Sequence, residues 1–146
     1  MPMYTLQRDG WTDFIHLFVD KTAKAMRRRI AKRSVADKWK PIHTLESLKD
    51  TLGLVQPIIS IDPSQPYAEV FLNEENLGVG IVAHECLHVA MAHERFVSRF
   101  AMNYGPGEGG GSLEDEERLA YYLTSVVKGV YNVLYDNGHC KPGKNP

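Results

Sequence analysis

The sequence predicts a single α+β domain spanning residues 1–146, and three observations support this prediction. A chain of this length and apolar content can bury one core. Strand-like segments occur at Val55–Ile61 and Tyr67–Leu72, where β-branched and aromatic residues lie between turn-forming residues. Two long segments with apolar residues at helical spacing follow, Leu77–Ala101 and Leu113–Leu134. We therefore expect a small sheet of two to four strands packed against these two helices.

The N-terminal segment is open to two assignments. Phe14–Val19 is rich in β-branched and aromatic residues, which is typical of a strand. Apolar residues then continue at helical spacing through Met26 and Ile30. We favour a helix over Thr12–Arg33, with the threonine or the aspartate at its start as N-cap.

The polar face of this helix is strongly basic. One interpretation is a surface for nucleic acid or another anionic partner. The other is a solvated helix face, which we favour because the formal net charge of the chain is −1. No aromatic residues are interleaved with the basic ones, so we do not expect nucleic acid as a partner. The residues concerned are Lys21, Lys24, Arg27, Arg28, Arg29, Lys32 and Arg33.

The middle of the chain predicts short elements. Leu45–Leu52 has the apolar spacing of a short amphipathic helix, with Thr44 as N-cap and Gly53 as its stop. In the strand Tyr67–Leu72, successive side chains point to opposite faces of the sheet. One face receives Tyr67, Glu69 and Phe71, and the other receives Ala68, Val70 and Leu72.

A glycine-rich segment joins the two C-terminal helices. Asn76 is the expected N-cap of the first helix. Gly78 and Gly80 in its first turn are poor helix formers and would let the preceding strand approach closely. We expect residues 105–111 to form a flexible loop and residues 141–146 to form a disordered tail.

The first C-terminal helix contains a metal-binding motif, His84-Glu85-x-x-His88, within Val82–Ala90. Residues four apart lie on nearly the same face of a helix, so both imidazoles can reach one metal ion. Glu85 is offset around the helix, where its carboxylate can reach a water beside that metal. This spacing is the signature of a zinc-protease helix with the glutamate as general base.

The residues around the motif are apolar on nearly every side, which predicts a buried helix. Buried histidines and a buried glutamate are costly unless a metal or polar partners compensate them. The alternative interpretation is a core helix whose histidines hydrogen-bond to nearby backbone. Cys86, between the histidines, is expected to be a small buried filler. The flanking apolar residues are Ile81, Val82, Ala83, Leu87, Val89, Ala90 and Met91.

A catalytic zinc usually has three protein ligands and one open position, and the sequence offers three sources for the third ligand. A histidine following the motif after a glycine is excluded, because Glu94 occupies that position and His93 lies off the face, as an expected surface residue. A second source is a carboxylate on the following helix, and a third is His139 or Cys140. The carboxylate candidates are Glu114, Asp115, Glu116 and Glu117.

His84-Glu85-x-x-His88 followed by Glu117-x-x-Ala120-Tyr121 resembles the gluzincin arrangement of zinc metallopeptidases. The resemblance covers Tyr67–Tyr131. It is strongest to small HExxH proteins of bacteriophages and bacteria, and more distant to metallopeptidases of the ImmA/IrrE type. It implies a minimal zincin-like domain with one Zn²⁺ held by His84, His88 and a glutamate of the next helix. It also implies that Tyr67–Leu72 is an edge strand lining the substrate.

The glutamate ligand is open between two residues, because the Asn-Glu pair of larger gluzincins is absent. Helical periodicity favours Glu116 as the core-facing residue, whereas the motif spacing favours Glu117. We choose Glu117.

The activity that the resemblance implies is hydrolysis of a peptide or protein substrate. Glu85 would take a proton from the attacking water and pass it to the leaving amine. An oxyanion donor besides zinc is needed, and Tyr121 is our candidate, with Tyr122, Tyr131 and His139 as alternatives. The competing interpretation is a catalytically idle zincin-fold protein, such as a phage virion component or a regulatory component.

The remaining features concern the compartment. No apolar run is long enough to span a membrane, and the N-terminus lacks the apolar region of a signal peptide. The two cysteines, Cys86 and Cys140, do not suggest a disulfide framework. We expect a cytoplasmic protein or, if it is phage-encoded, one in the host cytoplasm or the virion. The oligomeric state is not indicated.

Overall fold

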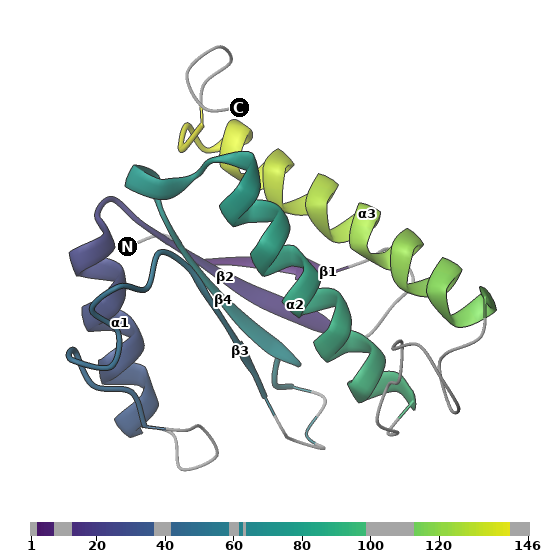
Figure 1. Cartoon of the computed structure of the whole chain (residues 1–146), viewed down its shortest axis with the longest axis horizontal. Helices are drawn as coiled ribbons and strands as arrows, with labels where there is room; N and C mark the ends of the chain where they lie inside the picture. The colour runs from purple at the N-terminus through teal and green to yellow at the C-terminus, as the bar shows by residue number, and fades with distance from the viewer. Residues whose placement is uncertain are drawn as a thin grey trace.

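A computed structural model describes residues 3–7, 13–36, 42–58, 62, 64–98 and 113–140, with backbone alone at 95–98 and 113–115. These residues form an α+β fold, as the sequence predicts (Figure 1). The strands are β1 (Met3–Gln7), β2 (Phe14–Asp20), β3 (Leu54–Pro57) and β4 (Ala68–Asn73). The helices are α1 (Ala23–Ala36), the short 3-10 helix η1 (Glu74–Asn76), α2 (Val79–Ser98) and α3 (Leu113–Asp136).

The four strands form one mixed sheet in the order β1-β2-β4-β3. β1 and β2 are antiparallel, β2 and β4 are parallel, and β4 and β3 are antiparallel. β4 is therefore central, and β3 is an edge strand among the described strands. The expectation that Tyr67–Leu72 is an edge strand is wrong, because β4 is hydrogen-bonded to a strand on each side.

The pleat of the central strands creates a core on each face of the sheet. One face packs with α2 and α3 and contains Leu17 and Val70. The opposite face packs with α1 and contains Phe18 and Phe71, whose stacked rings are 5.1 Å apart. The alternation predicted for the strand is confirmed within β4, but Tyr67, just before it, belongs to the core with α2 and α3.

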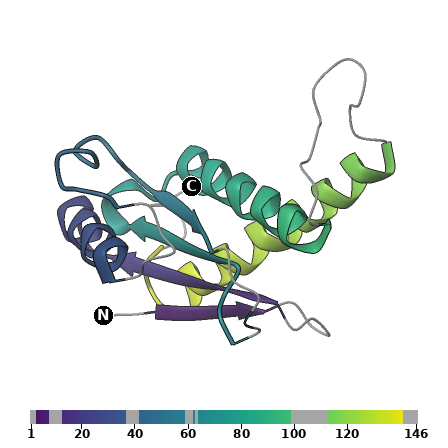
Figure 2. The ribbon, with the colours of Figure 1, turned by 90° about the horizontal axis from the view of Figure 1, so that it is seen from below.

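Helices α2 and α3 lie side by side and run antiparallel (Figures 1 and 2). Glu94 near the end of α2 accepts hydrogen bonds from Arg118 near the start of α3. The guanidinium Nε lies 2.9 and 3.1 Å from the two carboxylate oxygens, and Nη2 lies 2.7 Å from Oε2. This bidentate contact fixes the position of α3 along the axis of α2.

The prediction of one helix over residues 12–33 is wrong in its first half. Phe14–Asp20 forms strand β2, and α1 begins at Ala23. Hydrogen bonds to β1 and β4 on both sides of β2 outweigh the helical spacing that continues into α1. Thr22 instead caps the start of α1, where its Oγ1 accepts a hydrogen bond of 3.1 Å from the backbone N–H of Ala25.

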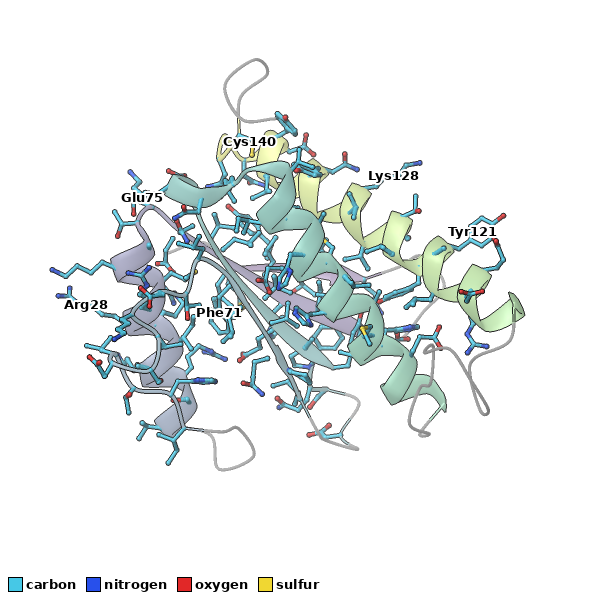
Figure 3. All side chains as sticks on the ribbon, in the orientation of Figure 1. Arg28, Phe71, Glu75, Tyr121, Lys128 and Cys140 are labelled. Atoms are coloured by element: carbon cyan, nitrogen blue, oxygen red, sulfur yellow. The ribbon has the colours of Figure 1, made fainter. Side chains whose placement is uncertain are left out.

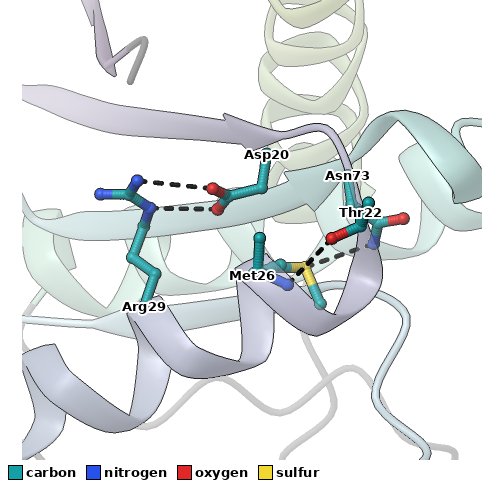
Figure 4. A network of polar contacts seen from close by, with 6 residues as sticks. Asp20, Thr22, Met26, Arg29 and Asn73 are labelled. Carbon is teal, nitrogen blue, oxygen red and sulfur yellow. Dashed lines mark hydrogen bonds and ion pairs between the residues drawn. The ribbon is translucent and has the colours of Figure 1, made fainter.

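Three of the seven basic residues assigned to a solvated face are bound within the fold. Arg29 forms an ion pair with buried Asp20, with Nε and Oδ2 3.0 Å apart (Figure 4). Arg33 forms one with buried Glu69 of β4, and Arg27 donates to a backbone carbonyl before β3. A solvated face is thus the wrong description for these three. The four exposed members of the set are Lys21, Lys24, Arg28 and Lys32.

The structure differs from the expectations at three further places. Residues 45–50 form turns and no helix, with Leu48 buried against α1 and Phe71. Strand β1 was not expected and pairs with β2. Gly78 and Gly80 have no atoms within 4 Å of where a Cβ would stand, so no strand approaches them closely.

The two long helices are confirmed. α2 begins at Val79 after η1, so Asn76 lies in η1 and is not the N-cap of α2. α3 ends at Asp136, and Gly138 adopts the left-handed conformation with φ of +76° in the turn that follows. The expected loop at 105–111 and the expected tail at 141–146 lie outside the described residues.

Candidate metal centre

His84 and His88 lie one turn apart on the solvent-exposed side of α2. Their Nε2 atoms are 3.2 Å apart, and their rings meet edge to face at 4.8 Å. The prediction that both imidazoles point the same way is confirmed. The expectation that they are buried is wrong, because both side chains are exposed while Val82, Cys86 and Val89 take the buried side of the helix.

The separation of the two Nε2 atoms fits two ligands of one tetrahedral zinc. Two Zn–N bonds of about 2.0–2.1 Å at the tetrahedral angle place the nitrogens about 3.3 Å apart. Two neutral imidazoles at 3.2 Å can also share one N–H in a hydrogen bond. Within the part of the chain that the structure describes, no group of three His, Cys, Asp or Glu side chains could hold a metal ion. The pair therefore fits two ligand positions, and the third is not supplied by those residues.

Glu85, between the two histidines, is only 6% exposed and lies on the flank of α2 toward β3. Its Cγ and Oε1 lie against Gly53, where a Cβ would be 3.1 and 3.3 Å from these atoms. Burial raises the pKa of Glu85, and neighbouring His84 lowers it in part. A carboxyl with a raised pKa is better matched to accept and return a proton near neutral pH.

Glu117 is not brought to the histidine pair. Its side chain is exposed near the start of α3, beside Arg118, which binds Glu94. Glu94 lies about 15 Å along the axis of α2 from His84, at about 1.5 Å per residue. Glu117 is therefore close to the opposite end of α2 from His84, which explains why it forms no ligand group with the pair.

The predicted oxyanion donor, Tyr121, is 72% exposed and projects from the outer side of α3 (Figure 3). Glu116 is also exposed, so the expectation from periodicity that it faces the core is wrong. Tyr122 is buried, and its hydroxyl is hydrogen-bonded to that of Tyr67. Tyr131 is partly buried against the core shared by α2 and α3. None of these residues adds a donor that the structure aims at the histidine pair.

The C-terminal alternatives for the third ligand have other partners. His139 Nε2 lies 2.6 Å from the hydroxyl of Tyr4, and its Nδ1 lies 2.8 Å from Oε1 of Glu74. Cys140 is buried in the core. Cys86 is buried too, and burial raises the pKa of its thiol to about 12, so its assignment as a buried filler is confirmed.

His93 departs most from its expected place on the surface. It is buried, its Nε2 lies 2.7 Å from Oδ2 of Asp13, and its ring stacks on that of Tyr122 at 3.8 Å. The signal was present, since His93 falls four residues after Val89 and seven after Cys86, on the buried side of α2. Asp13 could not be found this way, because it precedes β2 and meets His93 only in three dimensions.

Comparisons with known proteins add no assignment. No protein-family model, curated protein or solved structure has a significant match to this chain. None of the described helices is both long and apolar enough to cross a membrane.

Proposed function

We propose that the protein is a zinc-dependent metallopeptidase of minimal zincin type, with His84 and His88 as metal ligands and Glu85 as general base. The observation that carries the proposal is the 3.2 Å separation of two exposed Nε2 atoms on one helix face. Glu85 is a buried carboxyl between them in sequence, on the flank of α2 toward β3.

In the proposed hydrolysis, the metal would activate the water and the carbonyl, and Glu85 would transfer the proton. A zinc ion held by the histidines would supply a water that ionises near neutral pH and would polarise the scissile carbonyl. Glu85 accepts a proton from the attacking water and returns it to the leaving amine, which avoids expulsion of an unprotonated amide anion. The contact with Gly53 keeps the Glu85 side chain on the flank of α2 that faces β3.

The substrate in this proposal is an extended peptide that pairs with the free edge of β3. β4 is covered on both sides, whereas β3 has a strand on one side only among the described strands. Main-chain groups at such an edge can hydrogen-bond an added strand. Leu54 opens β3 directly after Gly53, so this edge starts beside the carboxyl of Glu85.

Metal content of the purified protein is the test. Elemental mass spectrometry should find about one zinc per chain in the native protein and none in His88→Ala. His43→Ala is the matched control, because it removes a histidine on another part of the surface and should keep the zinc. Folded native protein that takes up no zinc would refute the proposal.

A second measurement assigns the third ligand. The resemblance to gluzincins favours Glu117, whereas its place near the opposite end of α2 does not. Loss of a ligand should weaken zinc binding by more than the roughly 10–100-fold that loss of an outer-shell partner costs. Such a loss in Glu117→Ala, but not in Glu116→Ala, would mean that α3 brings Glu117 to the metal when zinc binds. Unchanged zinc affinity in Glu117→Ala would exclude it as a ligand.

The alternative function is a zincin-fold structural or interaction protein without turnover, such as a virion or regulatory component. It is favoured by the lack of a third ligand among the described residues and by the exposure of Tyr121. A protein that binds zinc through His84 and His88 but cleaves no member of a broad peptide library would support this alternative.

A further inference from the structure

Gly53, just before β3, lies so close to the candidate general base that a side chain there would meet it. A Cβ built on Gly53 would lie 3.1 Å from Cγ and 3.3 Å from Oε1 of Glu85, and 3.3 Å from Cγ2 of Ile81. Its φ is outside the left-handed region that favours glycine. The requirement for glycine at this position is therefore space for the Glu85 side chain.

The other described glycines do not make such a contact. Gly78 and Gly80, at the start of the same helix, have nothing within 4 Å of a built Cβ. Gly129 on α3 would contact Leu6 of β1 at 3.0 Å, away from Glu85. Close approach to Glu85 is thus specific to Gly53 among the glycines that the structure describes.

We propose that Gly53 is a positioning residue for Glu85, and this inference rests on the proposed peptidase function. The missing side chain of Gly53 leaves a slot between β3 and α2, and the slot fixes where the carboxyl of Glu85 lies. Because Gly53 directly precedes Leu54, the first residue of β3, the carboxyl of Glu85 is held at the start of the edge strand. A peptide on that edge then has its scissile bond held at a constant distance from the base.

A methyl group at position 53 would displace Glu85 without removing any polar atom. Contacts of 3.1 and 3.3 Å require the side chain to shift by a few tenths of an ångström. Proton transfer needs hydrogen-bond reach of about 2.6–3.2 Å, and misplacement by about 1 Å can cost about a hundredfold in rate. A smaller shift should therefore lower kcat by about tenfold. Zinc affinity and KM should not change, because His84, His88 and the edge of β3 are untouched.

The experiment compares Gly53→Ala with Gly80→Ala on a peptide that the native protein cleaves. Gly53→Ala should lower kcat about tenfold and keep KM and one zinc per chain. Gly80→Ala, which adds the same methyl group to open space, should keep the native kcat. A native kcat in Gly53→Ala would overturn the inference, and so would an equal loss in both variants.

A double-mutant cycle tests the contact without any turnover. The shift in urea midpoint caused by Gly53→Ala should be at least halved in a Glu85→Ala background, where only the contact with Ile81 remains. Equal shifts in the two backgrounds would overturn the inference whether or not the protein is a peptidase. If no peptide is cleaved but the cycle shows coupling, the proposed function fails and Gly53 only packs against Glu85.

Discussion

Helix α2 carries the same dipeptide twice, and the two copies have opposite surroundings. His84-Glu85 presents an exposed imidazole that faces His88 at 3.2 Å, with a buried carboxyl beside it. In His93-Glu94 both side chains are buried, and each contacts a side chain of opposite type from another part of the chain. Asp13 faces His93, and Arg118 binds Glu94.

The difference is that only one of the two pairs has partners from distant parts of the chain that hold it in the fold. At His93-Glu94 the contacts with Asp13 and Arg118 lie inside the protein, so the pair holds the end of α2 against α3 and the segment before β2. At His84-Glu85 both imidazoles are exposed and their Nε2 atoms lie 3.2 Å apart, a spacing at which one metal could bind both. The predictions below test this division.

Glu85→Gln should have the largest effect. If Glu85 is the general base proposed above, its loss should lower kcat by about 10²–10⁴-fold, while the two proposed histidine ligands should keep the zinc. Steady-state kinetics and metal analysis of the same preparation check both parts. Glu46→Gln, at an exposed site far along the chain, is the control and should behave as native. Retained hydrolysis in Glu85→Gln would show that the mechanism is wrong.

Arg118→Met should destabilise the fold by about 1–3 kcal/mol, because it removes the bidentate hydrogen-bond partner of the buried Glu94 carboxylate. Glu94→Gln should cost less, since Arg118 is more than half exposed and can be solvated. Urea denaturation measures both free energies of unfolding.

Lys128→Met is the control for this pair, because it replaces an exposed cation of the same helix (Figure 3). It should change stability by no more than about 0.5 kcal/mol. If Arg118→Met were as mild as Lys128→Met, the ion pair would have no structural role.

Zinc should stabilise the protein only by binding at His84 and His88, and not at His93. At a zinc concentration of about 100 times the Kd, the native protein should gain about 2.7 kcal/mol. The double variant His84→Ala, His88→Ala should lose this gain and unfold like the metal-free native protein. His93→Gln should be less stable than native but should keep the gain. Thermal melts with and without zinc distinguish these cases. Loss of the zinc-induced stabilisation in His93→Gln would show that His93, and not only His84 and His88, is needed for zinc binding.

The smallest signal is expected from chemical labelling of the Cys86 thiol. Cys86 lies between the two histidines in sequence but on the buried side of the helix. With a pKa of about 12, its thiol is only about one part in 10,000 ionised at pH 8. Labelling in a Cys140→Ala background should be slow and should rise about tenfold per pH unit until the pH nears that pKa. Fast labelling at pH 8 that zinc blocks would instead indicate that Cys86 binds the metal.

Local pattern predicted part of the fold and of the site. The spacing of His84 and His88 within one turn depends on helix geometry alone, and the structure confirms that the two rings meet. The apolar periodicity of α3 and the alternation along β4 are local signals of the same kind. The strand at Phe14–Asp20 was missed because its apolar residues match either period, and pairing with two neighbours decides between them.

The sequence by itself determined that two imidazoles and a carboxyl share one stretch of helix, because residues four apart meet through a single turn of backbone. Only the tertiary structure decided which polar side chains contact one another within the fold. Asp13, Glu69 and Arg118 meet their partners across long separations in the chain. It also decided that β3 is an edge among the described strands, that His93 is buried, and that Gly53 lies next to Glu85. Each of these depends on contacts between distant segments, and local periodicity carries no information about such contacts.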